Sequence, residues 1–252
     1  MDDADAFFRA DSSGFLMAHL EGKPAACISA VRYGKEYGFL GFYICRPELR
    51  GKGIGIQVWN AGLAQLEGRV IALDGVVGQQ DNYRKSGFAL AHNNIRFGGT
   101  PVVSPATDAG IREIEEKDVE ALINYDSAFF PDDRSAFMAN WLIAAPSRKV
   151  FLLEDDGKLQ GFGVVRHCRE GFKIGPLFAE NADCARRLFC QLVTVANGSE
   201  VFLDVPASNP QALELATFFD MKQVFETARM YKGKAPELPI ERTFGITTFE
   251  LG

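Results

Sequence analysis

Residues 50–55, of sequence RGKGIG, have the composition of a phosphate-binding loop. They follow an apolar run at residues 39–45 and precede a helical pattern that begins near Ile54. The first backbone N–H groups of a helix have no intrahelical partner and lie at the positive end of its dipole, so they attract anions. Glycines let the backbone approach an anion closely, and Arg50 and Lys52 add positive charge. The stretch predicts a strand, a glycine-rich turn and a helix N-terminus that together bind phosphate.

Three known phosphate-binding patterns were compared with this loop. A Walker loop needs Ser or Thr directly after its lysine, and here Lys52 is followed by Gly53. The dinucleotide fingerprint needs a glycine at position 56, which is Ile56. The third pattern, Arg/Gln-x-x-Gly-x-Gly/Ala, is matched by Arg50, Gly53 and Gly55 and resembles the motif of the GNAT acetyltransferases. A glycine-rich turn without a ligand is the alternative.

The residues after the loop extend this resemblance. An apolar stripe at helical spacing, which we expect to face a core, is formed by Ile56, Trp59, Leu63 and Leu66, and a short apolar strand then ends at Asp74. Residues 82–88, of sequence NYRKSGF, resemble the Tyr-Glu-Lys-x-Gly-Phe segment of the same superfamily, with Tyr83 four residues before the glycine. The two motifs stand in the expected order, and the resemblance covers residues 14–99.

The resemblance implies acetyl-CoA as the cofactor. It implies that backbone N–H groups of the loop hold the pyrophosphate and that the pantetheine arm lies along the end of the preceding strand, with Asn82 orienting the cofactor. The cofactor-binding residues that follow are Tyr43, Ile44, Cys45, Arg50, Gly51, Lys52, Gly53, Ile54, Gly55, Ile56 and Asn82. For Asn82, a plain helix N-cap is an equal alternative.

Tyr83 is the predicted catalytic acid. The pKa of a phenol, near 10, is close to that of an alkyl thiol, so proton transfer to a leaving thiolate is nearly thermoneutral. A packed aromatic ring is the alternative. Asp74 is the nearest carboxylate that could act as base, although its counterpart Asp204 favours a shared structural role at a strand end. Cys45 could form an acyl-enzyme, but no histidine close in sequence activates it, which favours packing.

Composition narrows the class of protein. The chain has 252 residues, 47% of them hydrophobic, and a formal net charge of −6, which disfavours nucleic acid as a partner. Five cysteines without a C-x-x-C pair predict neither disulfides nor zinc, and the three histidines lack ligand spacing, so no metal is expected. The N-terminus has no signal-peptide pattern and no run is long enough for a membrane helix, which predicts a cytoplasmic protein without a membrane partner.

The order of predicted elements is repeated along the chain. In the first half, strands at residues 15–20, 25–32 and 39–45 precede the loop, and residues 89–91 and 94–97 form a closing pair of strands. The second half repeats this order and ends in strands at residues 224–231 and 243–251. Its segments GPLFA, LDVPxxN and TTFELG resemble the C-terminal domain of a tandem-GNAT family.

These observations predict an α/β fold of two GNAT-like modules, each a mixed, mostly antiparallel sheet flanked by helices. The predicted division is residues 1–99 as the acetyl-CoA-binding domain, 100–110 as a linker and 111–252 as a degenerate GNAT-like domain. Only about a dozen residues precede the strand at residue 15, too few for the strand and two helices with which the family opens. The first module is therefore expected to lack that opening segment.

The predicted function is acetyl-CoA-dependent N-acetylation of a primary amine on a small molecule or peptide, by direct transfer. A non-catalytic acyl-CoA sensor is the alternative, and a homodimer is left open. The second half is expected not to bind CoA, because its equivalent loop, residues 179–183, has no Gly-x-Gly and carries Glu180 and Asp183, which would cap the helix and repel an anion. It is instead expected to shape the acceptor site, with Phe129, Phe130, Asp132 and Asp133 as a loop suited to a cationic amine.

Overall fold

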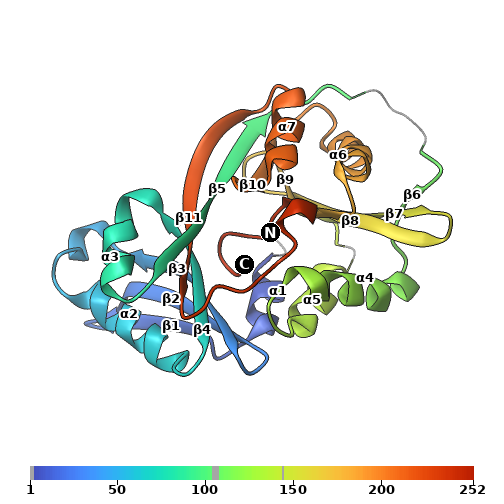
Figure 1. The fold of residues 1–252 in the computed structure, drawn as a ribbon. Coiled ribbons are helices and arrows are strands. Elements are labelled where there is room, and N and C mark those ends of the chain that lie inside the picture. Colours follow the sequence, from blue (N-terminus) through green and yellow to red (C-terminus); the bar gives the residue numbers. More distant parts are fainter. Residues whose placement is uncertain (1–2, 104–107, 144) are drawn as a thin grey trace.

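The computed structural model describes residues 3–103, 108–143 and 145–252 as a mixed α/β fold (Figure 1). Seven α-helices flank one 12-stranded sheet. The elements of the first half are α1 (Asp3–Ala10), β1 (Phe15–Leu20), β2 (Lys23–Tyr33), β3 (Tyr37–Cys45), α2 (Ile54–Gln65), β4 (Val70–Val76), α3 (Gln80–Lys85) and β5 (Ala89–Gly99). Those of the second half are β6 (Ile111–Glu113), α4 (Val119–Asp126), α5 (Ser135–Trp141), β7 (Arg148–Asp155), β8 (Lys158–His167), β9 (Phe172–Ala179), α6 (Ala182–Ala196), β10 (Val201–Pro206), α7 (Pro210–Phe218), β11 (Lys222–Lys232) and β12 (Thr243–Gly245).

The two halves share one sheet because they exchange their last long strands. The strand order is β1-β2-β3-β4-β11-β5-β10-β9-β8-β7-β6, and β12 pairs with β9. Strand β11 of the second half therefore pairs with β4, while β5 of the first half pairs with β10. Figure 1 shows β5 and β11 side by side between the two groups of helices. The division at residues 99 and 111 stays a prediction, and neither half completes its own sheet in space.

Pairing within the sheet is mostly antiparallel, as expected. The parallel pairs among the described strands are β3 with β4 and β9 with β10. Each of these pairs is connected by a helix, α2 or α6, as a parallel connection requires. The repeated order strand–helix–strand–helix–strand, predicted for both halves, is confirmed.

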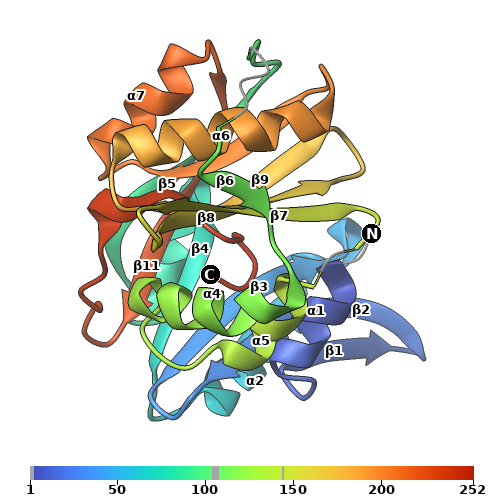
Figure 2. The ribbon, with the colours of Figure 1, turned by 90° about the vertical axis from the view of Figure 1, so that its right-hand side faces the viewer.

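Helices cover both faces of the sheet (Figure 2). Helices α6 and α7 lie on one side of the second half, and α1, α4 and α5 lie on the other. One buried core is shared between the halves, because Phe39 of β3 belongs to the same cluster as Phe130, Trp141 and Phe178 of the second half. Large aromatic side chains dominate this cluster. Burial of their apolar surface stabilises the contact between the halves.

Three sequence-based expectations about the fold were wrong in whole or in part. The opening segment is missing only in part, because residues 3–10 form the helix α1, whereas the described residues before β1 contain no strand and no second helix; α1 contacts α5 through Phe7 stacked on Trp141 at 5.8 Å. The predicted pair of strands after Phe88 is the single strand β5, since Ala91 to Asn93 continue the extended backbone and β5 pairs along its length with β11. The predicted strand at residues 243–251 is only three residues long, because the chain turns after Gly245.

Candidate active site

A cleft opens in the first half where two parallel strands separate. Strands β3 and β4 pair from Tyr37 opposite Val70 to Leu40 opposite Leu73, and no pairing follows although both strands continue. The gap has a volume of about 290 Å³. It is lined by residues of β3, β4, α2 and α3, together with residues of the second half.

A bulge in β3 contributes to this separation. Between the pairs Cys27–Ile44 and Ser29–Gly41, one residue of β2 faces two residues of β3, Phe42 and Tyr43. Phe42 adopts the left-handed conformation, with φ of 45°. A bulge of this kind bends its strand and interrupts the ladder of hydrogen bonds, so the end of β3 leaves β4 and its backbone faces the cleft.

The predicted phosphate loop lies at one end of the cleft and is open. Gly51 and Gly53 have φ of 74° and 78°, and a Cβ added at either position would have nothing within 4 Å. Gly53 is the N-cap residue of α2, where no side chain accepts a hydrogen bond from the first turn and no acidic residue lies in that turn. The first N–H groups of α2 are therefore available to an anion.

Within the loop, Arg50 and Gly55 contact the end of β3, whereas Lys52 faces solvent. Arg50 Nε donates to the carbonyl oxygen of Cys45 at 3.1 Å, which holds the loop against the end of β3. Lys52 is exposed. A Cβ at Gly55 would lie 2.8 Å from Tyr43 Oη, so the glycine lets the helix approach the Tyr43 side chain in the position it has here.

The corresponding loop of the second half is closed. The side chain of Asn181 accepts a hydrogen bond from the N–H of Cys184 at 3.0 Å and caps α6. The predicted cap by a carboxylate was wrong, because Glu180 instead pairs with Arg242 and Tyr125. One orphan N–H of α6 is nevertheless already satisfied and the loop has no glycine, while the absence of CoA binding by the second half stays a prediction.

The second half also lacks an open gap between its own parallel strands. Strands β9 and β10 pair only from Phe172 to Ile174, as β3 and β4 do over their first residues. Strand β12 pairs with β9 beyond that point, and the N–H of Ile246 donates to the carbonyl oxygen of Asp204 at 2.9 Å. The chain itself therefore occupies the space that is empty in the first half.

Tyr83 lies in the open cleft, on α3. Its ring packs directly on the backbone of Gly75, because a Cβ at Gly75 would lie 2.2 Å from Tyr83 Cε2. It also stacks on Trp59 at 5.6 Å between ring centroids, and Trp59 donates to Ser86 Oγ at 3.1 Å. Burial, and then the neighbouring phenol of Tyr43, raise the pKa of Tyr83, so it stays protonated at neutral pH.

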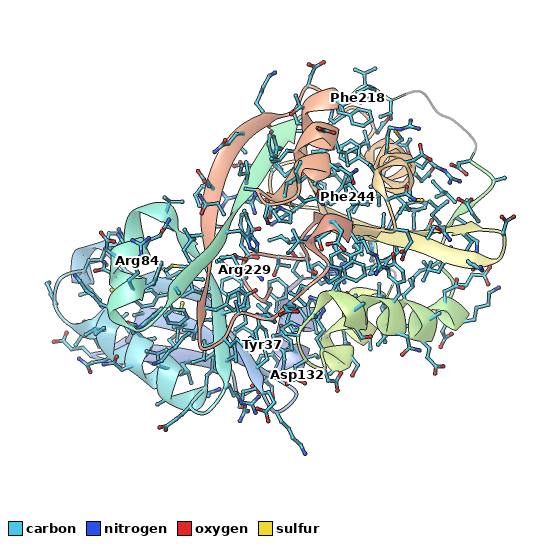
Figure 3. The ribbon with its side chains drawn as sticks, in the orientation of Figure 1. Tyr37, Arg84, Asp132, Phe218, Arg229 and Phe244 are labelled. Atoms are coloured by element: carbon cyan, nitrogen blue, oxygen red, sulfur yellow. The ribbon has the colours of Figure 1, made fainter. Side chains whose placement is uncertain are left out.

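Asp74 lines the same cleft but its carboxylate is occupied. Arg229 of β11 donates to it through Nε at 2.8 Å and Nη2 at 2.6 Å, and Asn94 donates through Nδ2 at 2.8 Å. Its counterpart Asp204 is bound in the same way by Arg96 of β5, at 2.7 and 2.9 Å. Each exchanged strand thus supplies an arginine to the strand-end aspartate of the other half. Figure 3 shows Arg229 in the middle of the molecule.

The other predicted site residues are placed as follows. Apolar surface lies beside the cleft and the loop, because the side chains of Tyr43, Ile44 and Ile56 are exposed by 41%, 55% and 52%. The prediction that Ile56 faces the core was therefore wrong. Asn82 lies inside α3, donates to Gln79 Oε1 at 2.7 Å and is not an N-cap residue. The Cys45 thiol donates to the carbonyl oxygen of Arg46 at 3.7 Å.

Several residues of the cleft were not found from the sequence. Phe225, Thr227, Phe249 and Glu250 of the second half line it, as does Arg96 of β5. The repeated offset of Arg96 and Arg229 in the two halves was the available signal, but it does not reveal that the strands are exchanged. Thr227 is only 2% exposed, and its hydroxyl has no hydrogen-bond partner among the described residues, so a bound polar group could satisfy it.

The aromatic and acidic loop predicted to hold a cationic amine has another role. Asp132 accepts a hydrogen bond from the N–H of Glu36 at 2.8 Å, and Asp133 accepts one from the N–H of Ser135 at 2.8 Å. Phe129 and Phe130 are buried. The loop thus contacts the turn before β3, whereas the cleft lies at the other end of that strand, so the loop does not line the cleft and its binding of an amine stays a prediction.

The described residues contain neither a membrane-spanning helix nor a cluster of metal ligands. Within residues 3–103, 108–143 and 145–252, no helix is long and apolar enough to span a membrane. The same part of the chain contains no cluster of three or more histidine, cysteine or acidic side chains arranged to hold a metal ion. All five cysteines are free thiols.

Comparison with known proteins agrees with this architecture. Residues 1–88 match the profile described as "Acetyltransferase (GNAT) family", and residues 122–245 match "Acetyltransferase (GNAT) domain". A holothin acyltransferase of Pseudoalteromonas sp. (strain SANK 73390) is 28% identical over 251 residues, which is 99% of this chain and 85% of that protein.

Two solved structures share the fold. A putative acetyltransferase from Pyrococcus horikoshii superposes with a TM-score of 0.85 at 23% identity, over 100% of this chain and 84% of the other. A tandem GNAT protein from the clavulanic acid biosynthesis pathway superposes with a TM-score of 0.63 at 11% identity, over 93% and 89% of the two chains.

Proposed function

Because the chain belongs to the GNAT superfamily and carries two GNAT domains, we propose that it transfers an acetyl group from acetyl-CoA directly to a primary amine of a small molecule or peptide. GNAT N-acyltransferases use an acyl-CoA donor and acylate amines. The Pseudoalteromonas relative is named for acylation of holothin, and this relationship favours an enzyme over the alternative of a non-catalytic sensor.

The observation that carries the proposal is the open helix N-terminus beside the gap between β3 and β4. Backbone N–H groups of residues 51–56 bind the pyrophosphate, with Arg50 and Lys52 adding positive charge. The exposed end of β3, at Tyr43, Ile44 and Cys45, holds the pantetheine arm. When bound, acetyl-CoA supplies a thioester carbonyl and a thiolate leaving group.

Tyr83 donates the proton that the departing sulfur needs. Its burial keeps the phenol protonated, and its stacking on Trp59 and Gly75 fixes its orientation in the cleft. Asp74 serves the structure rather than the proton transfer, because three hydrogen bonds already engage its carboxylate. Its role is to hold β11 beside β4.

The acceptor enters from the side of the cleft that both halves form. Phe42 and Phe225 are exposed by 36% and 42% there, and Phe249 lies beside Phe225 at 6.2 Å between ring centroids. Aromatic walls favour an amine carried on an apolar or aromatic scaffold over a small, fully hydrated one. The second half thus contributes to acceptor binding, while its own gap between β9 and β10 is filled by β12.

Calorimetry with acetyl-CoA tests the loop. The parent protein is expected to bind one acetyl-CoA per chain, and Gly53→Glu is expected to abolish binding because it places a carboxylate where the pyrophosphate lies. Gly22→Glu is a matched control, since Gly22 also has positive φ, of 75°, and open space around it, in the turn between β1 and β2. It carries the same charge change and the same backbone strain.

Turnover tests the reaction. Release of free CoA is measured with a panel of amines on apolar and polar scaffolds. Equal binding of acetyl-CoA by the Gly53→Glu variant and the parent would refute the assignment of the loop. Binding of two CoA molecules per chain would refute the proposal that only the first half binds CoA.

A further inference from the structure

The segment at residues 243–252 connects the two halves at the cleft. It begins as β12 between β9 and β10 and then crosses to the first half. There, Tyr33 Oη donates to the carbonyl oxygen of Leu251 at 3.0 Å. The carbonyl oxygen of Glu250 lies so close to Gly41 that an added Cβ would be 1.9 Å from it. The backbone of this segment is therefore held on both sides of Glu250.

Glu250 differs from every other residue of the segment. All nine others are buried, whereas Glu250 is half-buried and lines the open cleft with Tyr83. A charged side chain in a buried segment is expected to have a partner. No hydrogen bond or ion pair joins the Glu250 carboxylate to the residues that the structure describes, although its negative charge acts on the guanidinium of Arg96, which lines the same cleft.

The other ionisable groups that line the cleft are engaged or unsuited to accept a proton. The carboxylate of Asp74 is held by Arg229, and the guanidinium of Arg96 is held by Asp204. Burial raises the pKa of both Tyr43 and Tyr83, so these phenols are protonated. Glu250 is thus the carboxylate of this lining that can accept a proton from a ligand.

We propose that Glu250 is the general base of the reaction, which rests on the function proposed above. Glu250 accepts the proton that the acceptor nitrogen releases as that nitrogen forms its bond to the acyl carbon. Tyr83 donates a proton to sulfur as the carbon–sulfur bond breaks. Solvent in the open cleft returns a proton from Glu250 to the Tyr83 phenolate, so the products are the amide and free CoA, and both residues regain their starting states.

This assignment gives the second half a role in the chemistry. The first half supplies the donor site and the acid, and the second half supplies the base on a segment that also fills its own gap between β9 and β10. The buried hydroxyl of Thr227, also on the second half, is an additional polar group in the cleft without a partner among the described residues.

Glu250→Gln tests the proposal, because it keeps the shape and removes the charge. We expect kcat to fall by about a hundredfold or more, as for loss of one general base. The parent and the variant should also differ in the pH dependence of kcat, because only the parent has an ionisable side chain at position 250. Glu241→Gln is the matched control, since Glu241 is exposed and lies two residues before the segment.

A binding measurement provides a second readout. Amine is titrated into the protein saturated with CoA, and the affinity of the Glu250→Gln variant is expected to be about tenfold lower, because a hydrogen bond between charged groups is lost. The affinity for CoA itself should stay within about twofold. Glu250→Asp should recover part of kcat, and an unchanged urea midpoint would show that each variant folds.

The outcomes separate this inference from the proposed function. A kcat for Glu250→Gln within about threefold of the parent, with the same pH dependence, would overturn the role of Glu250 and leave the acyltransferase intact. A parent protein that binds acetyl-CoA but acylates no amine would overturn the proposed function, and this inference with it.

Discussion

The ion pair between Asp74 and Arg229 provides a direct test of how the halves are joined. The two side chains are exposed by 0% and 8%, and two of the three hydrogen bonds to Asp74 come from Arg229. Asp74→Asn removes the negative charge and leaves the guanidinium buried without compensation. Breaking a buried pair in this way costs about 3–5 kcal/mol, a large part of the roughly 5–15 kcal/mol that stabilises a typical domain.

Urea denaturation measures this loss. With a slope of about 3 kcal/mol per molar urea, as expected for a chain of this size, the midpoint should fall by about 1 to 1.7 M. The two tryptophans, Trp59 and Trp141, report on the first and second halves separately. Because the halves share strands and a core, both fluorescence signals should shift together. Asp81→Asn is the control, since Asp81 is 86% exposed and its pair with Arg84 contributes less than about 1 kcal/mol.

The same variant distinguishes a structural role from a catalytic one. If Asp74 only holds β11 beside β4, the kcat of Asp74→Asn without urea should stay within about tenfold of the parent. A variant that keeps its stability to within about 1 kcal/mol and loses more than a hundredfold in kcat would refute the structural reasoning and restore Asp74 as the base. Replacing both partners by leucine should recover part of the lost stability, because no buried charge then remains.

Two further predictions concern Tyr83 and His92. Tyr83→Phe should lower kcat by roughly ten- to a thousandfold with little change in CoA affinity, and an unchanged kcat with chemistry limiting the rate would return Tyr83 to a packing role. His92 lines a small cavity between the halves with Arg229, and burial, aided by that positive charge, lowers its pKa from 6.5 to about 4. The unfolded chain therefore binds more protons between pH 6.5 and 4, so this residue makes the free energy of unfolding fall by about 3 kcal/mol over that interval and no further below it. His92→Gln should lack this part of the acid destabilisation, and an identical pH dependence in urea titrations would contradict it.

Local pattern was sufficient to predict the parts of the site that lie close together in the chain. The phosphate loop, helix α2 and the strand that contains Asp74 follow from glycines, the spacing of apolar residues and turn chemistry within about 25 residues. The duplication was visible as well, because the two halves repeat the same order of elements. The family resemblance then supplied roles for Tyr83 and the loop, which remain predictions until they are measured.

Long-range pairing was not contained in these patterns. A strand has the same alternation of apolar and polar side chains whether it pairs with its own half or with the other half. The sequences of β5 and β11 therefore do not indicate that these strands are exchanged. Their partners are set by the buried arginine–aspartate pairs and by a core common to both halves, which join residues more than a hundred positions apart. For the same reason the sequence did not predict a role in the site for Glu250, which lies near the end of the chain. Its position in the cleft of the first half depends on β12 filling the gap of the second, a contact that no local sequence rule describes.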